Sequence, residues 1–191
     1  MKVFLFDDVK LFKRCIIIMF ALFVFGVVVG SIYLCAIPND DRGVFYYLES
    51  YLECINSGGL KKEIFTNSII NYIKIFIIVT VCSFIKFGLI PISAVSVVNG
   101  FCTGFTVSSF FMFYKLNGIR AVLAMLPALI IYICCLVFFC ARAVLFNYTK
   151  KNTTKRKIFS YLILSICYLT IFCITAFFDG FITTTFMKLF F

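Results

Sequence analysis

The chain alternates between long apolar runs and shorter polar or basic segments. The apolar runs cover approximately residues 15–37, 69–86, 88–113, 121–146 and 158–178. A helix of about 20 apolar residues crosses a hydrocarbon core of about 30 Å, and each run reaches roughly that length. The pattern therefore predicts an all-α polytopic membrane protein, in which a bundle of five transmembrane helices forms a single membrane domain over residues 1–191.

Composition supports this interpretation. Hydrophobic residues make up 63% of the 191 residues, and Phe alone occurs 27 times. Soluble domains are nearer half apolar, so little of the chain is left for a soluble domain. A cleavable signal peptide is the rival interpretation of the first run. That run is longer than the apolar core of a signal peptide and lacks a clear small-residue cleavage site, which favours a retained anchor.

The one sizeable polar segment covers residues 38–67. Apolar residues recur within it at helical spacing, at Phe45, Leu48, Leu52 and Ile55. This periodicity predicts one short amphipathic extracytoplasmic helix lying along the membrane surface. Such a helix could cover the end of the bundle or dock a partner protein, and the sequence does not separate the two. Glu49 and Glu53 are its candidate docking residues.

The third run carries a stripe of small and polar residues along one helical face. Its main members are Ser96, Gly100 and Gly104. Small residues let helix backbones approach closely in lipid, and Ser supplies interhelical hydrogen bonds. The stripe predicts a packing surface and makes this run the expected central helix. Pro91 lies near its start, where the missing N–H of proline is tolerated.

A second stripe of small residues lies in the fourth run, at Ala121, Ala124 and Ala128. A turn centred on Asn117-Gly118 separates it from the third run. The short connection predicts that the two runs pack as antiparallel neighbours. Pro127 should kink the fourth helix or leave a backbone carbonyl for a neighbour to satisfy.

Two charged residues lie in or beside the apolar runs. Lys74 is inside the second run, and Asp179 directly follows the fifth. An ionisable residue in a span is a functional candidate whose partner must be sought. Lys74 and Asp179 both belong to the outward ends of their helices, so they form a candidate polar pair. The alternative, that Lys74 reaches the headgroups and Asp179 is solvated, stays open.

Cationic residues set the predicted orientation. With five spans, the N-terminal head, the turn at Lys86 and the basic loop 147–157 share one side and, with Arg142, carry eleven Lys and Arg, against six on the other side. Cytoplasmic loops carry the excess of cations. The N-terminus and the loop 147–157 are therefore predicted to be cytoplasmic, and the segment 38–67 extracytoplasmic.

The chemistry that the chain lacks argues against an enzyme. There is no His, which excludes Ser-His-Asp and Cys-His catalysis. No phosphate-binding Gly-rich loop and no pair of intramembrane carboxylates occur. The ten Cys are scattered without a C-x-x-C pair, so neither a metal nor a cofactor is expected. The charges lie in blocks between apolar runs, which favours the lipid bilayer over nucleic acid as the partner.

The order of motifs from residue 67 onward resembles stage II sporulation protein M. The residues that carry the likeness are Asn67 to Lys74, Phe87 to Ile92, Asn99 to Val107, Leu116 to Ile119, Pro127 and Phe178 to Thr183. The segment Gly-Phe-Cys-Thr-Gly-Phe-Thr, at 100–106, is the strongest of these. Two positions depart from the family pattern: Ala128-Leu129-Ile130 stands where an Asn usually follows the proline, and Asp179 replaces the usual Glu.

The resemblance implies a role in endospore formation. Proteins of this family work at the sporulation septum and the mother-cell engulfing membrane of spore-forming bacteria, beside the wall-remodelling stage II sporulation proteins D and P. They are not hydrolases themselves but localise and assemble those partners during engulfment. The alternative function is a small transporter or permease subunit, although no inverted repeat is evident. An intramembrane enzyme is the third possibility.

Overall fold

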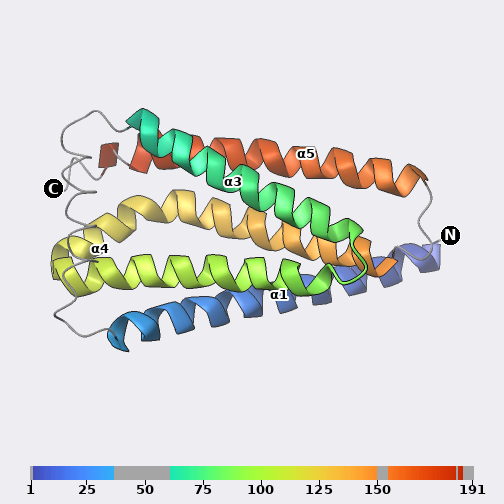
Figure 1. The fold of residues 1–191 in the computed structure, drawn as a ribbon, viewed down its shortest axis with the longest axis horizontal. Helices are drawn as coiled ribbons and strands as arrows, with labels where there is room; N and C mark the ends of the chain where they lie inside the picture. The colour runs from blue at the N-terminus through green and yellow to red at the C-terminus, as the bar shows by residue number, and fades with distance from the viewer. Residues whose placement is uncertain (1, 37–60, 150–154, 184, 187–191) are drawn as a thin grey trace.

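The computed structural model describes residues 2–36, 61–149, 155–183 and 185–186. Within these ranges, every regular secondary-structure element is a helix. The elements are α1 (Lys2–Ala36), α3 (Lys61–Phe84), α4 (Leu89–Thr149), α5 (Lys155–Phe177) and the π-helix η2 (Phe178–Thr183), arranged as a bundle in Figure 1. The predicted amphipathic helix, with Glu49 and Glu53, lies outside the described residues.

Five helical segments are long and apolar enough to cross a membrane. They are Lys10–Ala36, Phe65–Phe84, Leu89–Lys115, Gly118–Thr149 and Ile158–Thr183. This confirms the predicted fold class of a polytopic all-helical membrane protein. Many large apolar side chains are exposed on the outside of the bundle, where a membrane protein meets hydrocarbon. Examples are Ile17, Phe25, Ile77, Ile90 and Ile163.

Two of these spans belong to α4, which reverses direction at Lys115. Its backbone dihedrals there are φ 44° and ψ −115°, and it is the one non-glycine residue of the described chain with positive φ. The sequence places the turn at Asn117-Gly118 instead. Gly118 has a different role, because a Cβ added to it would overlap the carbonyl of Phe110. Its missing side chain lets the two halves of α4 approach at the turn.

The first half of α4 runs parallel to α1, as Figure 1 shows. The Ser96 hydroxyl donates to the Met19 carbonyl at 3.1 Å, and the Ser108 hydroxyl donates to the Ser31 hydroxyl at 2.9 Å. From the first contact to the second, both helices advance by 12 residues. The two helices therefore pack in parallel. This is the direction expected of two spans that are separated in the sequence by one span, α3, which crosses in the opposite direction.

The second half of α4 forms the centre of the bundle. The Phe139 ring lies 5.5 Å from the Phe76 ring of α3 and 5.4 Å from the Tyr168 ring of α5. Phe138 contacts Phe12 of α1 with ring centroids 6.4 Å apart. Between residues 135 and 146 most side chains are buried, including Cys135, Leu136, Val137, Phe139, Cys140, Ala141, Ala143 and Val144. The prediction that 88–113 is the central helix is wrong, because small residues mark a close contact and not a central position.

Pro91 and Pro127 both lie inside α4. Pro91 is in the first turn, where the first helical bond runs from the Ile92 N–H to the Gly88 carbonyl at 3.1 Å, so the absent N–H of Pro91 removes no hydrogen bond. Pro127 lies within the second half of α4 with helical backbone dihedrals, and its side chain is exposed. The break in α4 therefore occurs at Lys115, not at Pro127.

Asn147 joins the end of α3 to the end of α4. Its side-chain amide donates to the carbonyls of Ser83 at 3.1 Å and Ile85 at 2.6 Å. The last carbonyls of a helix lack intrahelical partners, and Asn147 satisfies that of Ser83 in α3 together with that of Ile85, the residue just after α3. α4 continues to Thr149, so Asn147, the first residue of the predicted loop 147–157, is helical.

Candidate functional site

Glycines from two helices meet along the contact between α1 and the first half of α4. A Cβ on Gly100 would overlap the Phe23 carbonyl, and one on Gly104 would overlap the Val27 carbonyl. Gly26 and Gly30 of α1 face the carbonyls of Val97 and Phe101 in the same way. Each helix thus contributes one G-x-x-x-G pair, and the backbones touch where side chains would otherwise separate them. We call this contact the glycine seam.

The serines of the predicted stripe add hydrogen bonds to the glycine seam. Ser96 is fully buried and donates to Met19, while Ser108 donates to Ser31 near the other end. The stripe containing Ser96, Gly100 and Gly104 therefore packs against the first span. The Gly26–Gly30 pair was not singled out from the sequence, although its G-V-V-V-G spacing carries the same signal as Gly100–Gly104.

The alanine stripe of the fourth run is also buried, next to the turn of α4. Ala121 and Ala124 pack with Phe110 of the preceding half-helix in a small apolar cluster. Ala128 is 1% exposed. The two halves of α4 thus contact each other beside the turn, while the glycine seam holds the first half against α1.

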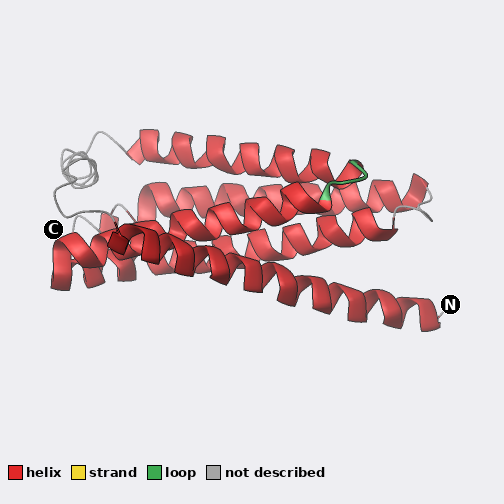
Figure 2. Ribbon diagram, turned by 60° about the horizontal axis from the view of Figure 1, so that its bottom comes forward, coloured by secondary structure: helices red, strands yellow, loops and turns green. Residues whose placement is uncertain are grey.

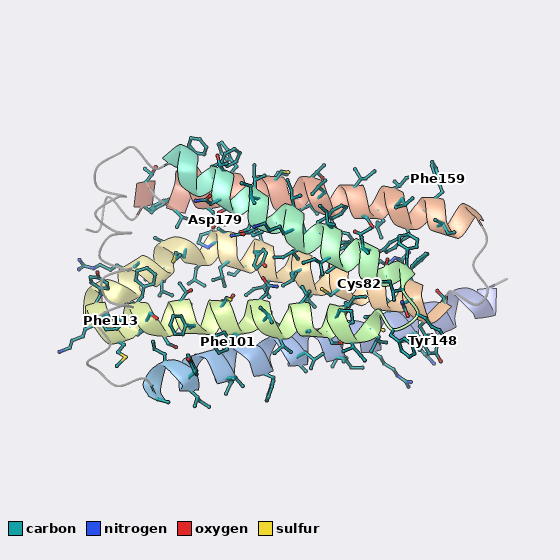
Figure 3. All side chains as sticks on the ribbon, viewed as in Figure 1. Cys82, Phe101, Phe113, Tyr148, Phe159 and Asp179 are labelled. Carbon is teal, nitrogen blue, oxygen red and sulfur yellow. The ribbon has the colours of Figure 1, made fainter. Side chains whose placement is uncertain are left out.

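A second cluster contains the polar groups buried between α3, α4 and η2. The Tyr72 hydroxyl of α3 donates to Asp179 Oδ2 at 2.5 Å. The Tyr132 hydroxyl donates to Asn99 Oδ1 at 2.6 Å, which joins the two halves of α4. The rings of Tyr72 and Tyr132 stack with centroids 5.0 Å apart. We call these four residues the tyrosine–aspartate cluster; Figure 3 labels Asp179 beside α3 and α4.

Packing around the tyrosine–aspartate cluster is aromatic. Phe172 of α5 lies 5.7 Å from the Tyr72 ring and 6.1 Å from the Tyr132 ring. Asp179 itself lies in η2, the π-helix that ends the last span. π-Helical turns are rare and occur frequently at functional sites. A carboxyl group within a span is costly, and the Tyr72 hydroxyl offsets part of that cost with a short hydrogen bond.

The candidate pair of Lys74 and Asp179 is not formed. Asp179 has Tyr72 as its partner, and Lys74 is exposed, with no ion pair between Lys74 and Asp179 in the part of the chain that the structure describes. Residues two apart on a helix point in different directions. Because Tyr72 faces the bundle, Lys74 faces away from it.

Sequence reasoning missed Tyr72, Tyr132 and Asn99. The position of Tyr72 could have been found, because the residues that face the bundle recur at helical spacing along α3. These residues are Tyr72, Phe76, Val79 and Ser83. Nothing in the local sequence marks Tyr132 or Asn99 as partners, since they come from two halves of α4 that meet only after the chain reverses. Over the described residues, no group of three or more His, Cys, Asp or Glu is placed to hold a metal ion.

A comparison with known protein families identifies the family to which this chain belongs. A family model described as Stage II sporulation protein M matches residues 19–184. The chain belongs to the stage II sporulation protein M family. The matched region contains both the glycine seam and the tyrosine–aspartate cluster. The protein is therefore a multi-pass membrane protein of a sporulation family. No curated protein and no solved structure shows a significant match to it.

Proposed function

We propose that this protein is a non-enzymatic membrane scaffold in endospore formation, which localises or assembles peptidoglycan-remodelling proteins at the septum during engulfment. The observation that carries the proposal is the family match over residues 19–184, which takes in almost all of the described bundle. Membership of a sporulation family supports a role in spore formation, and the fold is suited to a platform for partner proteins.

The bundle supports a scaffold through the way it uses its polar groups. Ser96, Ser108 and Asp179 all bond to other helices of the same chain. Interhelical hydrogen bonds and close backbone contacts are the forces that hold helices together in lipid. These groups stabilise one arrangement of the spans, which is what a protein needs to present a constant surface.

The proposed partners are stage II sporulation proteins D and P, at the septum and the mother-cell engulfing membrane. The extracytoplasmic segment 38–67 is the proposed docking element, with Glu49 and Glu53 as its docking residues. A partner that remodels peptidoglycan works outside the cytoplasmic membrane, so an extracytoplasmic segment of the scaffold is placed to reach it.

Deletion of the gene in its native host tests the function. We expect spore formation to stop at engulfment, while vegetative growth and solute uptake stay normal, and we expect the intact gene to restore engulfment. Fluorescence microscopy of membrane-stained sporulating cells measures the stage of arrest. An uptake defect in vegetative cells with normal engulfment would overturn the scaffold proposal in favour of the small transporter or permease subunit.

Charge reversal tests the docking residues. The double variant Glu49→Lys/Glu53→Lys should reach normal levels in the membrane, but smaller amounts of proteins D and P should co-purify with it. Glu63→Lys, a reversal at the start of α3, is the matched control and should recover both partners normally. Unchanged recovery with the double variant would move the docking surface away from the segment 38–67.

A further inference from the structure

α3 carries a cation at the middle of its span. The span is Phe65–Phe84, and Lys74 lies nine residues after its start and ten before its end. At 1.5 Å per residue, the Lys74 backbone is about 13–15 Å of helix from either end. Its side chain is exposed on the outside of the bundle. The Lys74 backbone therefore lies near the depth where a charge is most costly.

Two amides extend this surface towards the start of α3. Asn67 and Asn71 precede Lys74 by seven and three residues, so the three side chains share one helical face. All three are exposed. Figures 1 and 2 show α3 at the edge of the bundle, where it ends at the loop coloured green in Figure 2. We call Asn67, Asn71 and Lys74 the α3 polar face.

The described chain leaves the α3 polar face without partners. No hydrogen bond or ion pair to Asn67, Asn71 or Lys74 is present in the part of the chain that the structure describes. Asp179 is the one acid within the five described spans, and it already accepts the Tyr72 hydroxyl. Polar side chains in a span pair with one another, face a water-filled cavity or contact a partner. Among the described residues the α3 polar face has no such pairing, which makes it a candidate surface for a partner.

We propose that the α3 polar face docks a transmembrane helix of another protein, and that this helix carries an Asp or Glu at mid-membrane depth opposite Lys74. The carboxylate supplies the counter-charge, and the two Asn amides hydrogen-bond its neighbouring polar or backbone groups. The inference rests on the proposed scaffold function and names the kind of partner that the scaffold holds.

Depth and charge favour this occupant over the others. A lipid headgroup lies at the membrane interface, whereas Lys74 lies at the middle of its span. A second copy of this chain offers Asp179 as the acid within its described spans, and that group is bonded to Tyr72 between the helices of its own bundle. A single-pass protein with one intramembrane carboxylate can place its acid at the depth of Lys74, and that acid is not already bonded within a bundle.

Synthetic transmembrane peptides test the proposal. The purified full-length protein is reconstituted in phosphatidylcholine vesicles with one of three labelled poly-Leu peptides, whose central residue is Asp, Lys or Leu. Association is measured by energy transfer. We expect the Asp peptide to associate about tenfold more tightly than the Lys or Leu peptide, the ratio that one interhelical polar contact of ordinary strength produces.

Variants of Lys74 identify the contact. Lys74→Met should remove the preference for the Asp peptide, and Lys74→Glu should transfer it to the Lys peptide. Ile77→Met is the matched control, because Ile77 is also exposed on the outside of α3, and it should retain the preference. Thermal melting of each variant establishes that the bundle is folded before binding is compared.

Several results would overturn the proposal. These are equal association of the three peptides, a preference that survives Lys74→Met, self-association of the protein that Lys74→Met abolishes, and loss of Asp-peptide binding when phosphatidylglycerol replaces part of the lipid. The assay contains no sporulating cell, so its failure is separate from that of the scaffold function. A negative peptide result with an engulfment block would leave the scaffold standing and discard the α3 polar face.

Discussion

At the scale of single residues, Asp179 and Tyr72 show how a carboxyl group is accommodated inside a membrane span. The acid lies four residues before the end of the span Ile158–Thr183, and the Tyr72 hydroxyl donates to it at 2.5 Å. Water is scarce at this position, so the tyrosine replaces part of the hydration that the carboxyl loses. The contact also ties α3 to η2 across 107 residues of chain.

Removal of the tyrosine hydroxyl should destabilise the bundle. Tyr72→Phe keeps the ring stack on Tyr132 but leaves Asp179 without its donor, and we expect a loss of about 1–2 kcal/mol in the free energy of unfolding. Asp179→Asn and the double variant complete a double-mutant cycle, whose coupling energy should be about 1 kcal/mol. Unfolding of the purified protein in mixed micelles measures each value.

The matched control is Tyr148→Phe. Tyr148 lies in α4 with 72% of its side chain exposed, so the loss of its hydroxyl should leave the stability within about 0.5 kcal/mol of the wild type. A coupling energy of zero between Tyr72 and Asp179 would show that the hydrogen bond adds nothing to stability.

At the scale of elements, the glycine seam decides how α1 and the first half of α4 pack. Glycines on both helices remove the side chains that would hold the backbones apart, and serines bond across the same contact. In lipid there is no hydrophobic force between helices, so close packing and hydrogen bonds must supply the attraction. The seam is therefore sensitive to any added side chain.

Cysteine cross-linking tests the seam directly. In a background without native Cys, Ser31→Cys and Ser108→Cys should form a disulfide readily, because the two hydroxyls are 2.9 Å apart. Adding Gly100→Leu or Gly104→Leu should abolish the cross-link and lower the amount of folded protein, since the new side chain meets backbone atoms of α1. Gel mobility with and without reductant measures the disulfide.

Two controls isolate the seam. Ala94→Leu adds an apolar side chain to the exposed side of the same helix and should leave the cross-link intact. The pair Ser31→Cys and Ser93→Cys should not cross-link, because Ser93 lies about four helical turns from Ser108. Efficient cross-linking in Gly100→Leu would mean that α1 and α4 associate without the glycine contact.

At the scale of the whole molecule, the directions of the spans follow from the fold. α1 and the first half of α4 run parallel and side by side, α3, which comes between them in the sequence, runs in the opposite sense, and α5 returns towards the end that carries η2 (Figure 1). The excess of cations on one side predicts which end faces the cytoplasm. The N-terminus and the loop 147–157 are expected inside, and Asp179 at the outer end.

Reporter fusions check this orientation. A reporter that is active only in the cytoplasm should work when fused after Lys155 and should fail when fused after Phe191, because the last span separates the two positions. A fusion after Lys115, at the turn of α4, is expected to be inactive and serves as the control. Activity after Lys115 and Phe191 with none after Lys155 would reverse the orientation.

Much of the architecture is a local property of the sequence. Span number and order follow from apolar length alone, because each helix satisfies its own backbone in lipid and needs about 20 apolar residues to do so. The same holds for the stripe at Ser96, Gly100 and Gly104, since one helical face can be read from spacing. The order of motifs from residue 67 onward, with the segment 100–106 the strongest, indicated the family, which the match over residues 19–184 confirms.

The choice of partners depended on the tertiary structure. A stripe of glycines shows that something packs closely. The short turn predicted at Asn117-Gly118 suggested the fourth span as its partner, whereas the stripe packs on α1, where Ser96 bonds to Met19, 77 residues away. Asp179 likewise needed a partner, for which the sequence offered Lys74, whereas the structure supplies Tyr72, two residues away on α3. Only the rotation of α3 in the bundle selected Tyr72 and left Lys74 facing outward, because that rotation depends on how all the helices pack together.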